Sequence, residues 1–160
     1  MLYADSSVLV KHYLDERGSD NLNAKITETT GADQRVITSV LSFAEVHAAL
    51  ARKLQLRPAL RAAEYHWATT RFNSDWRIYL ARVQLIPEIL DLIPNLVKRH
   101  FLKGSEAVHL ASALWAGQRI EFDRNREPSA EQLIFATSDK QLARVARYEQ
   151  LKVFDPEDGI

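Results

Sequence analysis

The 160-residue chain contains no cysteine and no apolar run long enough to cross a bilayer. Without cysteine there is no disulfide framework and no thiolate ligand for a metal ion, and the composition fits a reducing compartment. The N-terminus lacks a basic region followed by a hydrophobic segment, so a secretory signal is not expected. We therefore predict a cytoplasmic protein that has no membrane partner.

The chain also lacks an excess of charge of either sign. Its 21 lysines and arginines balance 21 aspartates and glutamates, for a formal net charge of zero. A protein that binds nucleic acid only through the phosphate backbone is usually basic, so a nucleic-acid substrate would here require positive charge that is local. The length predicts one domain, residues 1–160, large enough to bury a core.

Short apolar runs alternate with longer segments of helical periodicity. Runs too short for helices predict strands at Leu2–Ala4, 36–38, 133–137 and Lys152–Phe154, and 84–86 is a fifth candidate. Helices are predicted at 7–16, 20–27, 40–54, 59–80, 87–99, 105–116 and 139–149, with Pro94 kinking or dividing the fifth. The pattern predicts a three-layer α/β/α sandwich with a central, mainly parallel sheet of four or five strands. The polar segment 121–131 is the expected mobile loop.

Four carboxylates fall where predicted strands give way to helices, and carboxyl ends of parallel strands are where open sheets form sites. Asp5 follows the first strand, Glu45 the second and Asp139 the 133–137 strand, whereas Glu106 begins a helix. Each has a structural alternative. Asp5 and Asp139 would serve equally well as helix caps, with Thr137 and Ser138 as competing caps for the latter helix. Glu106 in a first turn would favour the helix dipole.

Glu45 is the hardest of the four to explain structurally. Ser42 and Glu45 match the S-x-x-E capping box, but the strand ends near Thr38 and Ser39, which favours a helix start there. Glu45 would then lie inside the helix, on or beside its apolar stripe, where a carboxylate is costly unless it is paired or metal-bound.

If the four acids converge, they would hold either a proton or a hard cation. Two carboxylates about 4 Å apart repel by about 4 kcal/mol at an effective dielectric near 20. Oxygen ligands without cysteine favour Mg²⁺ or Mn²⁺ over zinc. Such an ion activates water and neutralises charge on a phosphodiester, as in acidic metal-dependent nucleases.

Four motifs together resemble the PIN domain, and most closely the VapC-type toxins of toxin–antitoxin pairs: YADSSVLVKHYLDE, ITSVLSFAEV, LKGSEAVHLASAL and FATSDKQLARVARYEQLKVFDP. The resemblance covers nearly the whole chain, with the motifs in family order. It implies an α/β/α domain with a parallel sheet and Mg²⁺- or Mn²⁺-dependent cleavage of RNA. It also implies a homodimer and a cognate antitoxin whose peptide covers the acidic pocket.

The resemblance places catalytic and metal-binding acids at Asp5, Glu45, Glu106 and Asp139, with the hydroxyls of Ser7 and Thr137 supporting them. The chain departs from the family at Glu106, where an aspartate is usual, and this puts metal affinity and rate in question. A second departure is Gln150, where the family usually has glycine near the last strand.

Other polar and aromatic residues have ordinary explanations. His109, on the helix of Glu106, is expected to be a satisfied, partly buried side chain rather than a general base, and Lys11 a solvated lysine rather than a phosphate ligand. Trp67, Phe72 and Trp76 are expected in the core. The arginines of the middle helices are expected to form a solvated face, with an RNA track as the alternative; they are Arg52, Arg57, Arg61, Arg71 and Arg77.

Two other functions compete with a nuclease. One is a PIN-like module that binds RNA or protein and is catalytically weak or inactive. Glu106, where the family usually has aspartate, would be the sign of that lost activity. The other is a phosphohydrolase or phosphoacceptor that uses Asp5; many such phosphatases carry a second aspartate two residues on, where this chain has Ser7.

Overall fold

The computed structural model describes residues 1–29, 36–56, 62–124 and 132–158. Five parallel strands form one sheet in the order β3-β2-β1-β4-β5. They are β1 (Leu2–Ala4), β2 (Ile37–Ser39), β3 (Ala81–Val83), β4 (Ile134–Ala136) and β5 (Lys152–Phe154). The predicted α/β class and parallel sheet are confirmed. In the described ranges, no helix is long and apolar enough to cross a membrane.

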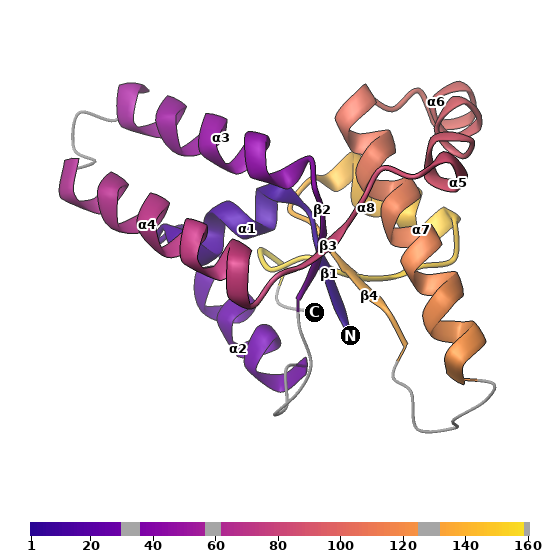
Figure 1. Cartoon of the computed structure of the whole chain (residues 1–160), viewed down its shortest axis with the longest axis horizontal. Helices are drawn as coiled ribbons and strands as arrows, with labels where there is room; N and C mark the ends of the chain where they lie inside the picture. Colours follow the sequence, from indigo (N-terminus) through magenta and orange to yellow (C-terminus); the bar gives the residue numbers. More distant parts are fainter. Residues whose placement is uncertain (30–35, 57–61, 125–131, 159–160) are drawn as a thin grey trace.

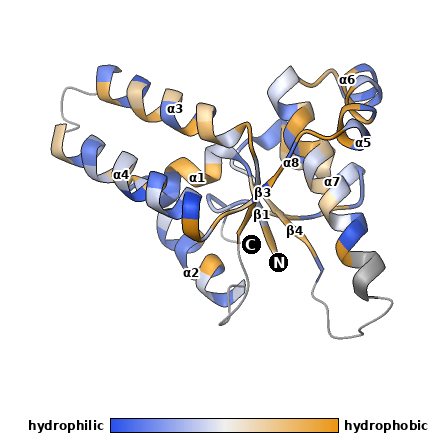
Figure 2. Cartoon of the chain, in the orientation of Figure 1, coloured by the Kyte–Doolittle hydropathy of each residue, from blue (hydrophilic) through white to orange (hydrophobic). Residues whose placement is uncertain are grey.

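Helices cover both faces of the sheet, as the three-layer prediction requires (Figure 1). The first face carries α1 (Ser6–Tyr13), α2 (Ser19–Thr29), α3 (Ser42–Leu56) and α4 (Ala62–Ile78), and the second carries α5 (Pro87–Leu90), α6 (Ile93–His100), α7 (Gly104–Arg124) and α8 (Lys140–Tyr148). Leu2 and Ala4 belong to the core under α1–α4, whereas Tyr3 between them belongs to the core under α5–α8. β1 and β4, in the middle of the sheet, lie toward the hydrophobic end of the scale in Figure 2, because both faces are covered.

The bounds of some predicted elements differ from the structure. The fifth strand is Ala81–Val83 rather than 84–86, because Ile86 donates back to the carbonyl of Gln84 in a tight turn before Pro87. The helix predicted at 87–99 is divided into α5 and α6, which is one of the two outcomes predicted from Pro94, and Pro94 lies in the first turn of α6. The loop predicted at 121–131 was wrong for its first four residues, which continue α7, and 125–131 lie outside the described residues.

Gly18 lets the turn between α1 and α2 lie against the segment that follows β5. Its φ is +87°, and a Cβ built on it would lie 2.7 Å from the carbonyl oxygen of Pro156. We expect Gly18→Ala to lower the free energy of unfolding by about 2–3 kcal/mol, because it combines backbone strain with a clash against main chain. Chemical denaturation measures the change.

Gly117→Ala is the matched control for this substitution. Gly117 lies within α7, where an added Cβ would meet Leu133 Cδ2 at an ordinary 3.5 Å. Alanine in a helix interior should therefore stabilise the protein by about 0.5–1 kcal/mol. A Gly18→Ala protein as stable as the wild type would contradict the close approach at Pro156.

Candidate active site

The strand order changes direction between β1 and β4, the place where open parallel sheets bind ligands. Asp5 follows β1 there and is only 3% exposed. Its Oδ1 caps α1 by accepting from the backbone N–H of Val8 (3.1 Å) and also accepts from Ser7 Oγ (2.6 Å). Its Oδ2 accepts from Thr137 Oγ1 (2.5 Å), the residue after β4. Asp5 is thus both the helix cap and a buried carboxylate at the switch point.

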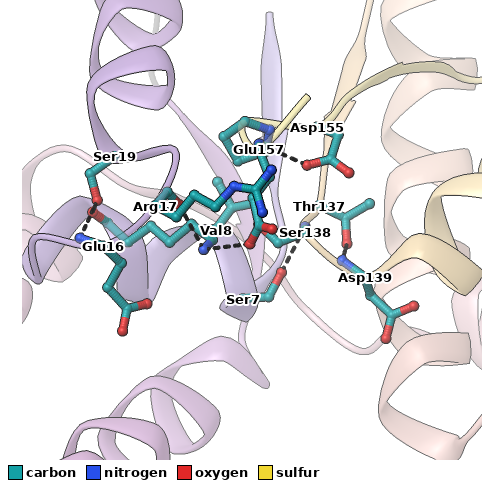
Figure 3. A network of polar contacts seen from close by, with 12 residues as sticks. Ser7, Val8, Glu16, Arg17, Ser19, Thr137, Ser138, Asp139, Asp155 and Glu157 are labelled. Atoms are coloured by element: carbon teal, nitrogen blue, oxygen red, sulfur yellow. Dashed lines mark hydrogen bonds and ion pairs between the residues drawn. The ribbon is translucent and has the colours of Figure 1, made fainter. Parts of the chain in front are cut away.

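Ser7 and Thr137 tie the two strand ends together. Each hydroxyl donates to Asp5, and each accepts from the backbone of the β4–α8 turn: Ser7 Oγ from the N–H of Ser138 (3.0 Å) and Thr137 Oγ1 from the N–H of Asp139 (3.1 Å) (Figure 3). Burial raises the pKa of Asp5, while the nearby His109 and these hydroxyls act against that rise.

Asp139 caps α8, accepting from the backbone N–H of Leu142 through Oδ1 (2.8 Å). Its other oxygen, Oδ2, makes no hydrogen bond within the part of the chain that the structure describes. Like Asp5, it therefore performs the structural role considered from the sequence and still presents a carboxylate oxygen at the same edge of the sheet.

Glu45 lies in the first turn of α3, because this helix begins at Ser42 and not at Thr38 or Ser39 as predicted. The strand continues through Ser39, and Thr38 Oγ1 bonds to the carbonyl oxygen of Ala4 (2.7 Å) and to Ser42 Oγ (2.6 Å). The hydroxyl of Ser42 is thereby drawn to Thr38. Glu45 turns toward the site instead, where its Oε2 accepts from Ser6 Oγ (2.8 Å).

His109 is the second partner of Glu45. Its Nε2 lies 2.7 Å from Glu45 Oε2, and its Nδ1 lies 3.1 Å from the hydroxyl of the fully buried Tyr3. Partial burial acts to raise the pKa of Glu45, but His109, with Ser6 and Ser105, leaves that pKa below its usual value. His109 is therefore hydrogen-bonded, as expected from the sequence, but it is almost fully buried rather than partly buried, and it orients Glu45.

Glu106 faces Lys103 with both carboxylate oxygens. Its Oε2 accepts from the backbone N–H of Lys103 (3.0 Å), and its Oε1 lies 3.0 Å from Lys103 Nζ. Hydrogen bonding and charge from Glu106 raise the pKa of Lys103, and Asp139 adds to the rise. The ammonium group of Lys103 is thus paired with Glu106 and is also influenced by the charge of Asp139.

The four acids share one edge of the sheet, but their side chains do not meet at a single point. Within residues 1–29, 36–56, 62–124 and 132–158, no three histidine, aspartate or glutamate side chains are close enough to hold a metal ion. Asp5 and Asp139 are linked through Thr137, Glu45 is linked to His109, and Glu106 is held by Lys103. The donor set is nonetheless hard oxygen, which suits Mg²⁺ or Mn²⁺.

Sequence reasoning missed a fifth carboxylate at this edge. Asp155 follows β5 as Asp5 follows β1, and it is 1% exposed. Lys140 Nζ lies 2.7 Å from its Oδ2, and the N–H of Glu157 donates to its Oδ1 (2.9 Å). The strand-then-acid pattern that singled out Asp5 is equally visible at Phe154 and Asp155.

Lys11 is buried, and the expectation of a solvated lysine was wrong. Its ammonium donates to Glu157 Oε1 (2.8 Å) and to the carbonyl oxygen of Arg17 (2.9 Å), because the segment after β5 folds back over α1 (Figure 3). Among the middle-helix arginines, Arg71 pairs with the buried Asp75 (3.0 Å), whereas Arg57 and Arg61 lie outside the described residues. Arg52 and Arg77 are exposed.

The fold and site define an α/β/α domain with carboxylates at the carboxyl edge of a parallel sheet, the PIN-like arrangement. No family model matches the sequence. Two curated proteins do: ribonuclease VapC45 of Mycobacterium tuberculosis strain CDC 1551 / Oshkosh and ribonuclease VapC49 of strain ATCC 25618 / H37Rv. Each is 34% identical over 125 residues, which is 73% of this chain and 77% of the relative. The chain belongs to the VapC family of PIN-domain toxins.

A solved structure agrees with the fold. The crystal structure of VapBC2 from Rickettsia felis, bound to a DNA fragment from their promoter, matches with a TM-score of 0.60 over 97% of this chain and 98% of that chain. The sequences are 9% identical, so this likeness bears on the fold alone.

Proposed function

We propose that the chain is a Mg²⁺- or Mn²⁺-dependent endoribonuclease and the toxin of a type II toxin–antitoxin pair. The proposal is carried by one observation. A chain that is 34% identical to two named ribonucleases places Asp5 and Asp139 on either side of the β1/β4 switch point and ties them through Thr137. A phosphodiester bound there would lie against the acids.

Asp5, Glu45, Glu106 and Asp139 are the residues that would hold the ion, and a bound divalent cation supplies an activated water and neutralises phosphate charge. The neighbouring residues position these acids. Ser7 and Thr137 fix both oxygens of Asp5, and His109 and Ser6 fix one oxygen of Glu45. Lys103 holds Glu106, so Glu106 would have to exchange this ion pair for the metal.

The family also supports a proposal about partners. VapBC2 is a complex of two proteins crystallised on promoter DNA. For this chain we propose a cognate antitoxin that covers the acidic edge, and a homodimer as the toxin's own state. Both rest on the family alone.

The rival function is a weak or inactive PIN-like binding module. It is favoured by the pairing of Glu106 with Lys103 and by the absence, among the described residues, of three acids or histidines close enough for one ion. A phosphoacceptor role for Asp5 has less support, because both of its oxygens are buried and hydrogen-bonded.

Removal of metal should abolish RNA cleavage. We expect the purified chain to cut single-stranded RNA with Mg²⁺ or Mn²⁺, to stop when EDTA is in excess, and to recover when Mn²⁺ is restored, because the acids otherwise repel the phosphate. Gel analysis of a labelled RNA measures cleavage, and calorimetry with MnCl₂ measures binding of the ion. Cleavage that persists in EDTA would contradict the metal-dependent reaction. No cleavage together with no Mn²⁺ binding at millimolar concentration would favour the inactive module.

A further inference from the structure

The connection between α6 and α7 holds an aromatic residue that folding does not explain. Phe101 is the C-cap of α6 in the left-handed conformation, with φ 54° and ψ 37°, where glycine or asparagine is normally found. Its side chain is 86% exposed, the highest value among the large exposed hydrophobic residues of the described chain. The residue therefore carries backbone strain without burying its ring.

Phe101 lies in the connection that leads to the first turn of α7, which carries Glu106, one of the four proposed metal ligands. Lys103, two residues later, binds Glu106 through both its backbone N–H and its ammonium group. The surface at Gly104, the first residue of α7, is open, since a Cβ built there would meet nothing within 4 Å. Figure 1 shows α6 beside the first turns of α7, so the connection lies at the end of α7 that carries Glu106.

The charge around Phe101 is positive in a chain that is neutral as a whole. Lys98, Arg99 and Lys103 are exposed, and the sequence from Leu92 to Ser105 contains no acid. Lys98 has no ion-pair partner within the described residues. Arg99 forms an ion pair with Glu149 (3.1 Å), and Lys103 forms one with Glu106 (3.0 Å). The side chains of these two cations are 55% and 82% exposed. Such exposed pairs are weak and leave their cations able to meet phosphate.

We infer that Phe101, with Lys98, Arg99 and Lys103, forms a binding strip for single-stranded RNA that leads the strand to the four acids. A base would stack on the ring of Phe101, and the cations would contact the flanking phosphates. The strand must be single because bases within a duplex are already stacked and do not offer a free face. This inference deepens the proposed ribonuclease function by naming the form of RNA and how it is held.

Binding without divalent metal tests the strip independently of cleavage. A fluorescein-labelled single-stranded RNA of about 12 nucleotides is titrated with protein in EDTA and followed by fluorescence anisotropy. Phe101→Asn should weaken binding by about tenfold, whereas Phe101→Tyr should bind within about twofold of the wild type because it keeps the stacking face. A duplex of the same sequence should bind the wild type more weakly than the single strand.

Stability separates a binding role from a structural one. Asparagine accepts the left-handed conformation more readily than phenylalanine, so the melting temperature of Phe101→Asn should not fall. The matched control is Tyr79→Asn, which removes another exposed aromatic residue (60%) at the opposite edge of the sheet, just before β3, and should leave RNA binding unchanged. Lys98→Gln should reduce the slope of log affinity against log salt by about 0.7.

The outcomes distinguish this inference from the proposed function. The strip is overturned if the wild type and Phe101→Asn bind RNA with equal affinity, or if the wild type does not bind RNA, even when RNA is cleaved. The exposed ring of Phe101 would then be assigned to contact with a protein partner. Loss of binding in Phe101→Asn but not in Tyr79→Asn supports the strip. If the wild type then fails to cleave with Mg²⁺ or Mn²⁺, the nuclease proposal fails while the RNA-binding strip stands.

Discussion

Asp5→Asn should lower RNA cleavage by about 10²- to 10³-fold, the size of effect seen when one preorganised charged or polar group is removed from an active site. Asp5 is the acid at the switch point whose two oxygens are fixed by Ser7, Val8 and Thr137. An amide of the same shape removes the negative charge that would hold the cation. Its remaining oxygen still accepts from Val8, so α1 keeps its cap and the fold should survive.

Asp20→Asn is the control for this substitution, because Asp20 is an exposed acid in the first turn of α2 and lies outside the site. It should cleave at the wild-type rate. The assay measures initial rates on one labelled RNA with Mn²⁺, and circular dichroism checks that both variants are folded. Equal rates for Asp5→Asn and the wild type would remove Asp5 from the mechanism and leave it as the cap of α1 alone.

The sequence was sufficient to predict the sheet and the edge on which the acids lie. Apolar triplets such as Leu2–Ala4 are too short for a helix and too apolar for a strand with one solvent-exposed face. They therefore predict strands that are covered on both faces. Acids that follow parallel strands necessarily share one edge. Those two rules place Asp5 and Asp139 on the same edge without any knowledge of contacts.

The contacts of the site could not be predicted, because they depend on side chains far apart in sequence. Glu45 and His109 are 64 residues apart, and Lys11 and Glu157 are 146 residues apart. The start of α3 was misplaced for the same reason, since Thr38 bonds across to the carbonyl of Ala4 instead of capping the helix. The pairing of Lys103 with Glu106 is local, and its i,i+3 spacing in the sequence already indicates it.

Three aromatic residues of α4 were predicted to lie in the core, and their helical spacing explains which of them do. Phe72 and Trp76 are four residues apart and lie on one face, where Phe72 is fully buried and Trp76 is partly buried. Trp67 precedes Phe72 by five residues, which turns it well away from that face, and it is 59% exposed. The prediction for Trp67 was therefore wrong, and the periodicity already contained the reason.

Phe72→Ala should have the largest effect on stability, lowering the free energy of unfolding by about 3–5 kcal/mol. The ring of Phe72 is fully buried where α1, α3 and α4 meet. Its centroid lies 5.3 Å from that of Tyr13, 5.4 Å from His47 and 5.7 Å from Trp76. Alanine leaves a cavity that three helices must collapse to fill, and it removes the aromatic contacts as well. Denaturation in urea, with the midpoint and slope compared to the wild type, measures the loss.

Trp67→Ala on the same helix is the matched control, and because Trp67 is mostly exposed it should cost less than about 1 kcal/mol. Comparable losses for the two variants would mean that α4 is not anchored through Phe72. Cleavage measured per folded molecule should fall far less for Phe72→Ala than for Asp5→Asn, since none of the ring contacts of Phe72 involves a proposed metal ligand. The core under α1–α4 holds the first turn of α3 in place, whereas the hydroxyls of Ser6, Ser7 and Thr137 orient the acids, so stability and chemistry should respond to different substitutions.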